Sequence, residues 1–236
     1  MSELIFVRHG QASFGQESYD KLSERGLEQV RILARHFQQT GQEFDFMYSG
    51  TLQRQKETAA ELISLLKNKQ TEPIERSALN EYNADPLIQI YLRNHSTAEG
   101  LDPELHWPIR EEKLFQRVFE AATAKWIQNQ LKPGLQDSEF EQWSAFQERV
   151  HGALSEIMAS HSSGSRVLIS TSGGVIAMAL QSVLQLPDKQ VIALNWMVYN
   201  SSITRIKYGN DKISLTQFNS LPHLEREGLK HMVTYR

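Results

Sequence analysis

Short apolar runs and longer amphipathic segments alternate along this chain. The first run, residues 4–7, consists of strand-forming residues and leads directly into Arg8, His9 and Gly10. A similar run at 166–171 leads into a serine and a pair of glycines. Continuous apolar runs of this length are typical of strands buried on both faces of a sheet. Because ligands collect beyond the carboxyl ends of such strands, we expect the polar residues that follow them to face a binding crevice.

The spacing of the remaining apolar positions predicts an α/β fold. Longer segments repeat at helical spacing, whereas shorter ones alternate as strands do. The predicted helices lie at 24–40, 52–66, 87–92, 114–122, 139–160 and 173–180, and the further strands at 44–47, 73–76, 203–207 and 213–218. We expect a three-layer sandwich in which helices cover both faces of a mostly parallel sheet.

Two of the predicted helices have plausible N-caps, Ser23 and Thr51. The second cap places Arg54 in the first turn of its helix, where a cation opposes the helix dipole by a few tenths of a kcal/mol to about 1 kcal/mol. Near a bound phosphate the same position is favourable, because the helix N-terminus and the guanidinium act on one anion. The alternative is a solvated surface arginine.

Residues 83–138 form the least regular part of the pattern. They combine short amphipathic segments with a loop that contains Gly100, Pro103 and Pro108. We interpret them as a helical insertion that lies over the crevice as a lid, within a single domain that spans residues 1–236.

Composition narrows the function classes. The chain has 236 residues, 40% of them hydrophobic, a formal net charge of -3 and no cysteine. This charge gives no global reason to bind nucleic acid or an anionic membrane, so any affinity for phosphate must be local. The lack of cysteine excludes disulfides, thiol catalysis and thiolate metal sites. The apolar run near the N-terminus is too short for a signal-peptide core, and no apolar run has the length of a membrane span, so we expect a cytoplasmic protein.

The residues at the predicted crevice suit phosphate-ester chemistry. Such a reaction needs a nucleophile, cations for the phosphoryl oxygens and an acid for the leaving group. His9 can be the nucleophile, Arg8 and Arg54 the cations, and Glu81, which follows a predicted strand, the acid. The alternative for Glu81 is a solvated loop residue.

Four further residues are candidates for binding the substrate. Gln11 and Ser13 belong to a polar loop, 11–20, that can line a pocket. Ser172 and Gly173 lie where a strand turns into a helix, which is the geometry of a phosphate cradle. We predict no metal site and no cofactor, because the eight histidines show no ligand spacing.

Several segments together resemble the histidine phosphatase superfamily, the phosphoglycerate mutase-like proteins. They are residues 4–11, 19–26, 49–59, 79–81, 200–204 and 219–224. The resemblance implies that His9 becomes phosphorylated during turnover, that Arg54 is the second phosphate-binding arginine and that Glu81 is the acid. It covers nearly the whole chain except the insertion.

One position departs from the family pattern. Ser172 stands where family members typically carry a second catalytic histidine. A hydroxyl donates one hydrogen bond but brings no positive charge, and the loss of a donor aimed at developing charge costs about 10²- to 10³-fold in rate. His36, His151 and His161 lie on predicted helices, whereas His95, His106 or His223 could fold over the crevice in its place.

We therefore expect phosphate monoester hydrolysis through a phosphohistidine at His9, weakened by the serine at 172. One alternative is a non-catalytic module that keeps the arginine cradle and binds a phosphorylated ligand. The other is a phosphoglycerate-type mutase. The expected partner is a phosphorylated small molecule or a phosphoprotein.

Overall fold

The computed structural model describes residues 1–13, 20–68, 72–95, 105–210 and 212–235. The chain divides into two compact units, one formed by Met1–Glu81 with Val150–Arg236 and the other by Tyr82–Arg149. The predicted insertion, 83–138, falls inside the second unit. Its role as a lid stays a prediction. Gly100 and Pro103, assigned to the loop of the insertion, lie outside the described residues.

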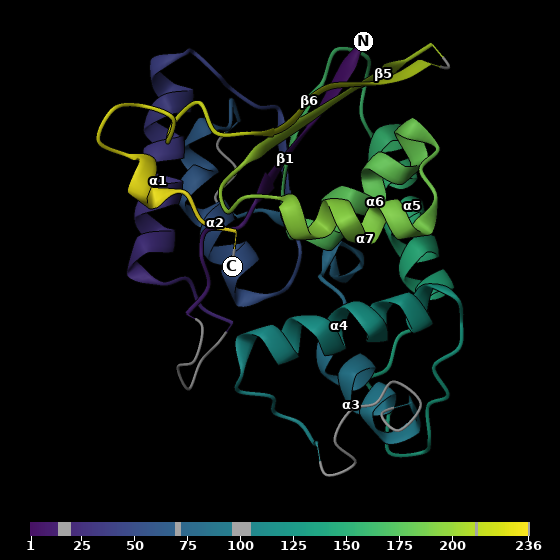
Figure 1. Cartoon of the computed structure of the whole chain (residues 1–236). Helices are drawn as coiled ribbons and strands as arrows, with labels where there is room; N and C mark the ends of the chain where they lie inside the picture. The colour runs from purple at the N-terminus through teal and green to yellow at the C-terminus, as the bar shows by residue number, and fades with distance from the viewer. Residues whose placement is uncertain (14–19, 69–71, 96–104, 211, 236) are drawn as a thin grey trace. The chain divides into compact units, whose positions relative to one another are not determined.

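A mixed sheet forms the centre of the first unit. In the described part of the chain it has six strands in the order β3-β2-β4-β1-β5-β6. The strands are β1 (Ser2–Arg8), β2 (Phe46–Ser49), β3 (Ile74–Glu75), β4 (Arg166–Thr171), β5 (Ile203–Gly209) and β6 (Lys212–Ser220). Neighbouring strands from β3 to β1 pair in parallel. Strand β5 lies between β1 and β6 and pairs antiparallel with both of them (Figure 1). The expected α/β fold with a mostly parallel sheet is confirmed.

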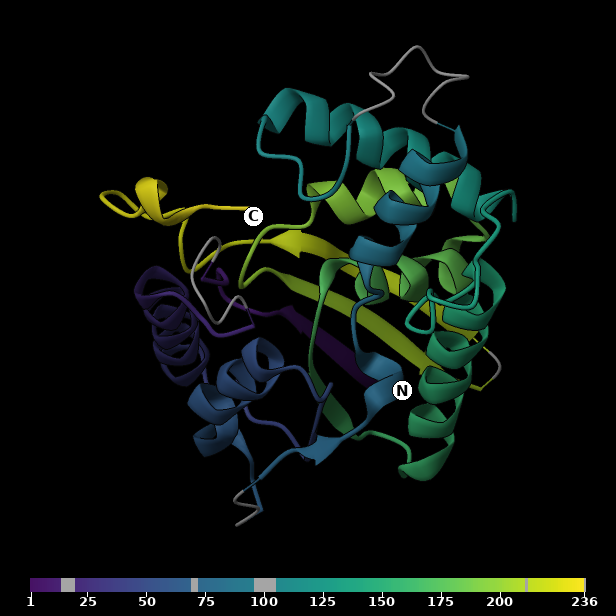
Figure 2. The same ribbon diagram turned by 90° about the horizontal axis from the view of Figure 1, so that it is seen from below.

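Helices of the first unit cover both faces of this sheet. Figure 2 shows α1 and α2 on one side of the strands and α6 on the other. The helices are α1 (Glu24–Gln39), α2 (Gln53–Leu62), α6 (Gly173–Leu184) and α7 (Asp188–Met197), with 3-10 turns at Ile63–Leu65, Ser77–Leu79 and Lys230–Met232. The second unit contains α3 (Ala84–His95), α4 (Glu112–Ile127) and the start of α5 (Trp143–Ser160). No helix in the described ranges combines the length and hydropathy needed to cross a bilayer.

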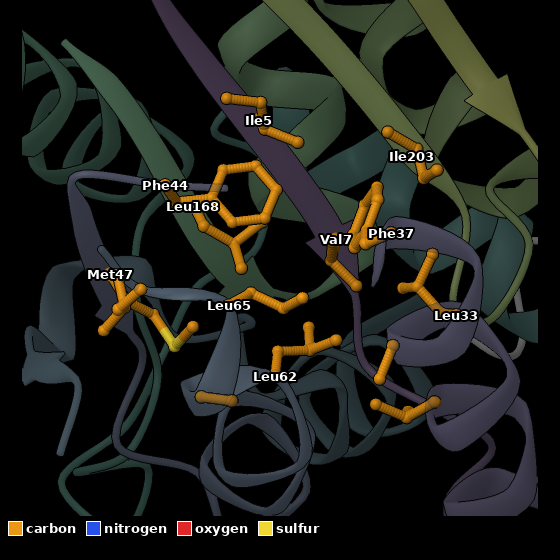
Figure 3. Close-up of a cluster of buried hydrophobic side chains, with 14 of the residues drawn as sticks. Ile5, Val7, Leu33, Phe37, Phe44, Met47, Leu62, Leu65, Leu168 and Ile203 are labelled. Atoms are coloured by element: carbon orange, nitrogen blue, oxygen red, sulfur yellow. The ribbon is translucent and has the colours of Figure 1, made fainter. Parts of the chain in front are cut away.

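The alternation of side chains along β1 explains why this strand is central. Ile5 and Val7 point into a cluster with residues of α1 and α2, such as Phe37 and Leu62 (Figure 3). Residues 4 and 6 are equally buried, so both faces of the strand are covered. Burial of each such side chain stabilises the fold by about 1.5–3 kcal/mol. Because both faces of the strand are buried, residues 4–7 form a continuous apolar run instead of alternating with polar residues.

The structure corrects several predicted boundaries. The second strand begins at Phe46, because Phe44 lies before it and forms only an isolated bridge to Leu66. Ser23 is confirmed as the N-cap of α1, since its side chain accepts from Gly26 N. Thr51 is not the N-cap of α2; the cap position is Leu52, which has no acceptor in its side chain.

One further element differs from the predicted pattern, and one agrees with it. Helix α7 was not predicted, because only Val191 and Ile192 of its residues are buried and no apolar stripe marks it. The predicted hairpin at 203–218 is confirmed as β5 and β6, although Asp211 in its turn lies outside the described residues.

The parallel register brings three strand ends to one edge of the sheet. Arg8 at the end of β1 pairs with Thr171 at the end of β4, and Ser49 at the end of β2 pairs with Ser170. The residues that follow these strands therefore emerge side by side. This edge carries the candidate site.

Candidate active site

His9 follows the last residue of β1. Its backbone N–H donates to Thr171 O at 2.9 Å, and only 5% of the residue is exposed. Ring Nδ1 lies 2.7 Å from Gly10 O, and Nε2 accepts a hydrogen bond from Arg54 Nε at 3.2 Å. Because Nε2 is an acceptor in this pair of contacts, we assign the ring hydrogen to Nδ1, which donates to Gly10 O.

The surroundings of His9 favour the neutral ring. Burial, followed by the positive charges of Arg54 and Arg8, lowers the pKa of His9 well below its ordinary value. The bond to Gly10 O opposes this shift but is outweighed. The imidazole is therefore uncharged at neutral pH, and Nε2 carries the lone pair that a nucleophile requires.

Close backbone packing explains the glycine after His9. A Cβ on Gly10 would lie 2.4 Å from Gly26 O, and a Cβ on Gly26 would lie 2.1 Å from Gln11 O. Both distances are shorter than any van der Waals contact, and the atoms met are backbone. The start of α1 thus fits against the His9 loop only because both positions are glycines.

Arg54 reaches His9 from the first turn of α2. Its side chain is 12% exposed, and its NH1 pairs with Asp20 Oδ1 at 2.5 Å. The other carboxylate oxygen of Asp20 accepts from Gln53 N at 2.8 Å, so Asp20 supplies the cap that Leu52 lacks. The predicted alternative, a solvated surface arginine, does not hold for this largely covered and paired side chain.

Arg8 lies on the other side of the strand end. Its NH1 donates to Val198 O, the carbonyl at the C-cap of α7, and to Tyr235 O at 3.1 Å. Carbonyls at a helix C-terminus carry partial negative charge and attract cations. Arg8 is thereby held next to His9, and its charge contributes to the low pKa of the imidazole.

Glu81 is placed by the N-terminus of α6. Its Oε2 accepts from Gly174 N at 3.0 Å. Backbone N–H groups in the first turn of a helix have no partners within the helix and bind carboxylates well. The carboxyl group therefore lies where β4 turns into α6, which is the same edge as His9.

Ser172 is the N-cap residue of α6 but its side chain does not cap the helix. It is completely buried, and its Oγ accepts from Gln55 Nε2 at 2.8 Å. The same nitrogen also donates to Leu79 O at 3.2 Å. The position where the family resemblance implies a histidine thus holds an uncharged hydroxyl bound to a buried amide. A Cβ on the neighbouring Gly173 would lie 2.6 Å from Asn195 Oδ1, so that position is also tightly packed.

The predicted binding loop is only partly described. Gln11 Oε1 accepts from Ser23 Oγ at 3.1 Å, and Gln11 N donates to Gln29 Oε1 at 2.9 Å, which ties this residue to α1. Ser13 is buried and its N–H donates to Lys21 O at 2.8 Å. Their contact with substrate stays a prediction, and loop residues 14–19 lie outside the described residues.

Asp20 and Gln55 are the polar site residues that sequence reasoning missed. Both lie inside segments that carry the family resemblance, and their position in these segments is the feature of the sequence that could have identified them. Neither follows a strand directly, so the strand-end rule did not select them. Within the described ranges, no group of three His, Asp or Glu side chains is close enough to hold a metal ion.

His223 is linked to the candidate site through Ser201. Its Nε2 lies 2.9 Å from Ser201 Oγ, and Ser201 N in turn donates to Arg8 O at 3.0 Å and His9 O at 3.3 Å. Burial, with the nearby His36 and Arg226, lowers the pKa of His223 to about 3. His223 thus supplies no positive charge at neutral pH.

Comparisons with known proteins show which family the chain belongs to. A family model for the histidine phosphatase superfamily (branch 1) matches residues 4–88 and 92–221. Over 202 residues the chain is 26% identical to a 2,3-bisphosphoglycerate-dependent phosphoglycerate mutase of Parvibaculum lavamentivorans, a match that covers 81% of this chain and 84% of the relative. The enzyme of the same description from Bartonella tribocorum is 25% identical over 128 residues. The chain covers only 57% of that relative, and the match uses 50% of the chain.

A solved structure shares the fold. The phosphoserine phosphatase of Entamoeba histolytica, in a mutant form in complex with phosphoserine, superposes with a TM-score of 0.63 at 18% identity, covering 95% of this chain and all of the other. The chain therefore belongs to the histidine phosphatase superfamily.

Proposed function

We propose that this protein hydrolyses phosphate monoesters by way of a phosphohistidine at His9. The observation that carries the proposal is the state of the imidazole: it is buried and neutral, its Nδ1 is bound to Gly10 O, and its Nε2 is directed at the guanidinium of Arg54. This combination of an oriented ring, an available lone pair and an adjacent cation is what transfer of a phosphoryl group to histidine requires.

The first half of the reaction forms the phosphohistidine. Nε2 of His9 attacks phosphorus, the bond to the ester oxygen breaks, and its electron pair leaves with that oxygen. Glu81, entering in its protonated form, gives its proton to the leaving oxygen. Arg8 and Arg54 neutralise charge on the remaining phosphoryl oxygens.

The second half releases inorganic phosphate. Water attacks the phosphorus, Glu81 takes a proton from it, and the P–N bond breaks with its electron pair returning to Nε2. The protein is then restored with Glu81 protonated and His9 neutral. A mutase would differ only at this step, because a second acceptor would replace water.

Substrate also has to displace the Arg54 hydrogen bond from Nε2 of His9 before this nitrogen can attack. In the structure Arg54 donates its Nε–H to the same lone pair that attacks phosphorus. We infer that a phosphoryl oxygen takes over this donor, because an anion is a stronger acceptor for a guanidinium than a neutral imidazole is. Binding of phosphate and release of the lone pair are then one event.

Ser172 lowers the expected rate. Its hydroxyl hydrogen can still be donated to a phosphoryl oxygen, but it adds no charge. The bond from Gln55 to Ser172 favours a second candidate function, a module that binds phosphorylated ligands without turnover, because a buried neutral pair replaces a catalytic cation. Between these two, the neutral His9 beside Arg54 supports the enzyme, since a binding site alone needs no nucleophile.

The substrate that we propose is a small phosphomonoester. The mutase relatives and the phosphoserine phosphatase are named for small phosphorylated metabolites, which supports this choice over a phosphoprotein. Such a substrate needs no extended groove.

The test is phosphate release from a panel of phosphomonoesters that includes phosphoserine, 3-phosphoglycerate, sugar phosphates and nucleotides. Wild type and His9→Ala are prepared identically and compared from mildly acidic to neutral pH. We expect turnover that disappears in His9→Ala while the fold persists. Equal inactivity of both proteins, with phosphate still bound by the wild type, would instead support the binding module.

A further inference from the structure

Asp20 joins two groups at the start of α2. One carboxylate oxygen accepts from the backbone N–H of Gln53 at 2.8 Å, and the other pairs with NH1 of Arg54 at 2.5 Å. The first contact anchors the carboxylate to the helix, and the second anchors the guanidinium to the carboxylate. Arg54 is thus restrained at its far end as well as by its own backbone.

This restraint determines what the guanidinium faces. With NH1 taken by Asp20, the Nε–H of Arg54 is directed at Nε2 of His9, at 3.2 Å. An arginine side chain has several rotatable bonds, and without a partner its head group samples many positions. The ion pair with Asp20, which is itself fixed by Gln53 N, selects one of these positions. The line of contacts from Asp20 through Arg54 to His9 therefore links an ion pair to the nucleophile.

We propose that Asp20 is a positioning residue that holds the Arg54 guanidinium in register with Nε2 of His9. The proposal rests on the phosphohistidine function given above. Asp20 touches neither the nucleophile nor, in this account, the substrate. It acts through Arg54, so that the phosphoryl group arrives in line with the lone pair of His9.

A purely structural role would have a different outcome. Asp20 also caps α2, and a cap contributes about 0.5–2 kcal/mol to stability wherever the helix lies. The substitution Asp20→Asn separates the two roles, because the amide oxygen can still accept from Gln53 N whereas the negative charge that pairs with the guanidinium is lost. Asp20→Glu restores the charge on a longer side chain.

Asp45 offers a matched control. Its Oδ2 accepts from Arg166 N at 2.8 Å and its Oδ1 pairs with Lys67 Nζ at 2.8 Å, which is again a carboxylate between a backbone N–H and a cation. It lies just before β2 and beside the start of β4, whereas His9 follows the end of β1. Asp45→Asn removes the same charge far from the nucleophile along the parallel strands.

The first measurement is steady-state hydrolysis of p-nitrophenyl phosphate by wild type, His9→Ala, Asp20→Asn, Asp20→Glu and Asp45→Asn. We expect Asp20→Asn to lower kcat about 10- to 100-fold, because small misplacements of a catalytic group have effects of that size. KM should change less than the turnover number. Asp20→Glu should recover part of the loss, and Asp45→Asn should retain wild-type kcat.

The second measurement does not depend on turnover. In protein labelled with ¹⁵N at histidine, the Nε2 resonance of His9, assigned by its absence in His9→Ala, reports both the Arg54 contact and the titration of the ring. We expect Asp20→Asn to shift this resonance, because the Arg54 Nε–H no longer keeps its position beside Nε2. Asp45→Asn should leave the resonance unchanged.

The outcomes separate this proposal from the function on which it rests. If wild type shows turnover that depends on His9, but Asp20→Asn keeps wild-type kcat and an unchanged Nε2 resonance, the positioning role is wrong and the phosphatase stands. If no protein shows turnover, the phosphatase is wrong, and the Nε2 resonance alone decides whether Asp20 positions Arg54. A shifted resonance in Asp20→Asn supports positioning, and an unshifted one overturns it.

Discussion

Arg54 donates its Nε–H to Nε2 of His9 at 3.2 Å, so the cation proposed to bind phosphate covers the lone pair proposed to attack it. The two residues belong to different elements, the first turn of α2 and the loop after β1, and meet because β1 and β2 end at the same edge of the sheet. One arriving anion can therefore both bind and activate the site.

Substitution of Arg54 should affect the transition state more than the fold. We expect Arg54→Ala to lower kcat/KM about 10³-fold, and Arg54→Lys to lower it about 10²-fold, because an ammonium keeps the charge but not the planar set of donors. The assay is hydrolysis of p-nitrophenyl phosphate. Arg31→Ala is the control, since Arg31 of α1 forms a surface ion pair with Glu61 of α2. Wild-type activity in Arg54→Ala would contradict the assigned role.

The glycine after His9 should be irreplaceable for steric reasons. Gly10→Ala places a methyl carbon 2.4 Å from Gly26 O, so the backbone must shift, and we expect the free energy of unfolding to fall by about 1–3 kcal/mol or more. Gly152→Ala is the control: in helix α5 its methyl group meets nothing within 4 Å, and we expect a gain of about 0.5–1 kcal/mol. Urea denaturation measures both. Equal effects of the two substitutions would argue against close packing at Gly10.

The sequence was sufficient to predict the strand that carries the site. The apolar run at 4–7 is buried on both faces, so the local pattern alone was enough to predict a buried strand there. Helix α7 was missed because its apolar residues form no stripe at helical spacing. A helix this short is stabilised by its contacts with α6, which the sequence pattern does not show. The α2 cap was misplaced for a related reason: the acceptor comes from Asp20, which is distant in sequence from Gln53.

The same distinction applies to the site. Arg8 ends β1, His9 follows it and Ser172 stands between β4 and α6, so a strand-end rule selects these three residues. Glu81 comes after the 3-10 turn Ser77–Leu79. Asp20 and Gln55 act through contacts with residues from other segments, namely Arg54 for Asp20 and Ser172 for Gln55. Pairings of this kind depend on tertiary packing, which a single sequence does not reveal.

Restoration of a histidine at position 172 should require a second change. Ser172 is fully buried and Gln55 Nε2 lies 2.8 Å from its hydroxyl, so a larger ring has to displace the amide. We expect Ser172→His alone to lower stability by about 1–3 kcal/mol, the usual cost of overpacking. The double variant Ser172→His with Gln55→Ala should hydrolyse p-nitrophenyl phosphate about 10- to 100-fold faster than Gln55→Ala alone. No gain over Gln55→Ala would show that serine does not limit the rate.

His223 should make the fold sensitive to acid. Its pKa is lowered to about 3, below the value of about 6.5 expected in the unfolded chain. Between these values the unfolded chain binds a proton that the folded protein does not, so the free energy of unfolding falls as the pH drops below 6.5. This residue should account for a loss of about 3 kcal/mol at pH 4, and none above neutral pH.

Urea denaturation of wild type and His223→Gln at several pH values between 7 and 4 measures this effect. The variant should be less stable at pH 7, because the contact with Ser201 is altered, yet it should lose less stability on acidification. His9, whose pKa is also lowered, contributes a loss of the same sign in both proteins. Parallel pH dependences of wild type and variant would contradict the assigned protonation of His223.

The central claim, that His9 accepts the phosphoryl group, is tested most directly by observation of the covalent intermediate. Protein mixed with the best substrate of the panel is quenched rapidly in alkali, where phosphohistidine is stable, and its peptides are analysed by mass spectrometry. We predict one added phosphoryl group on the peptide that contains His9, formed and lost at rates consistent with kcat. Turnover in wild type without phosphorylation of His9, or undiminished turnover in His9→Ala, would contradict the account.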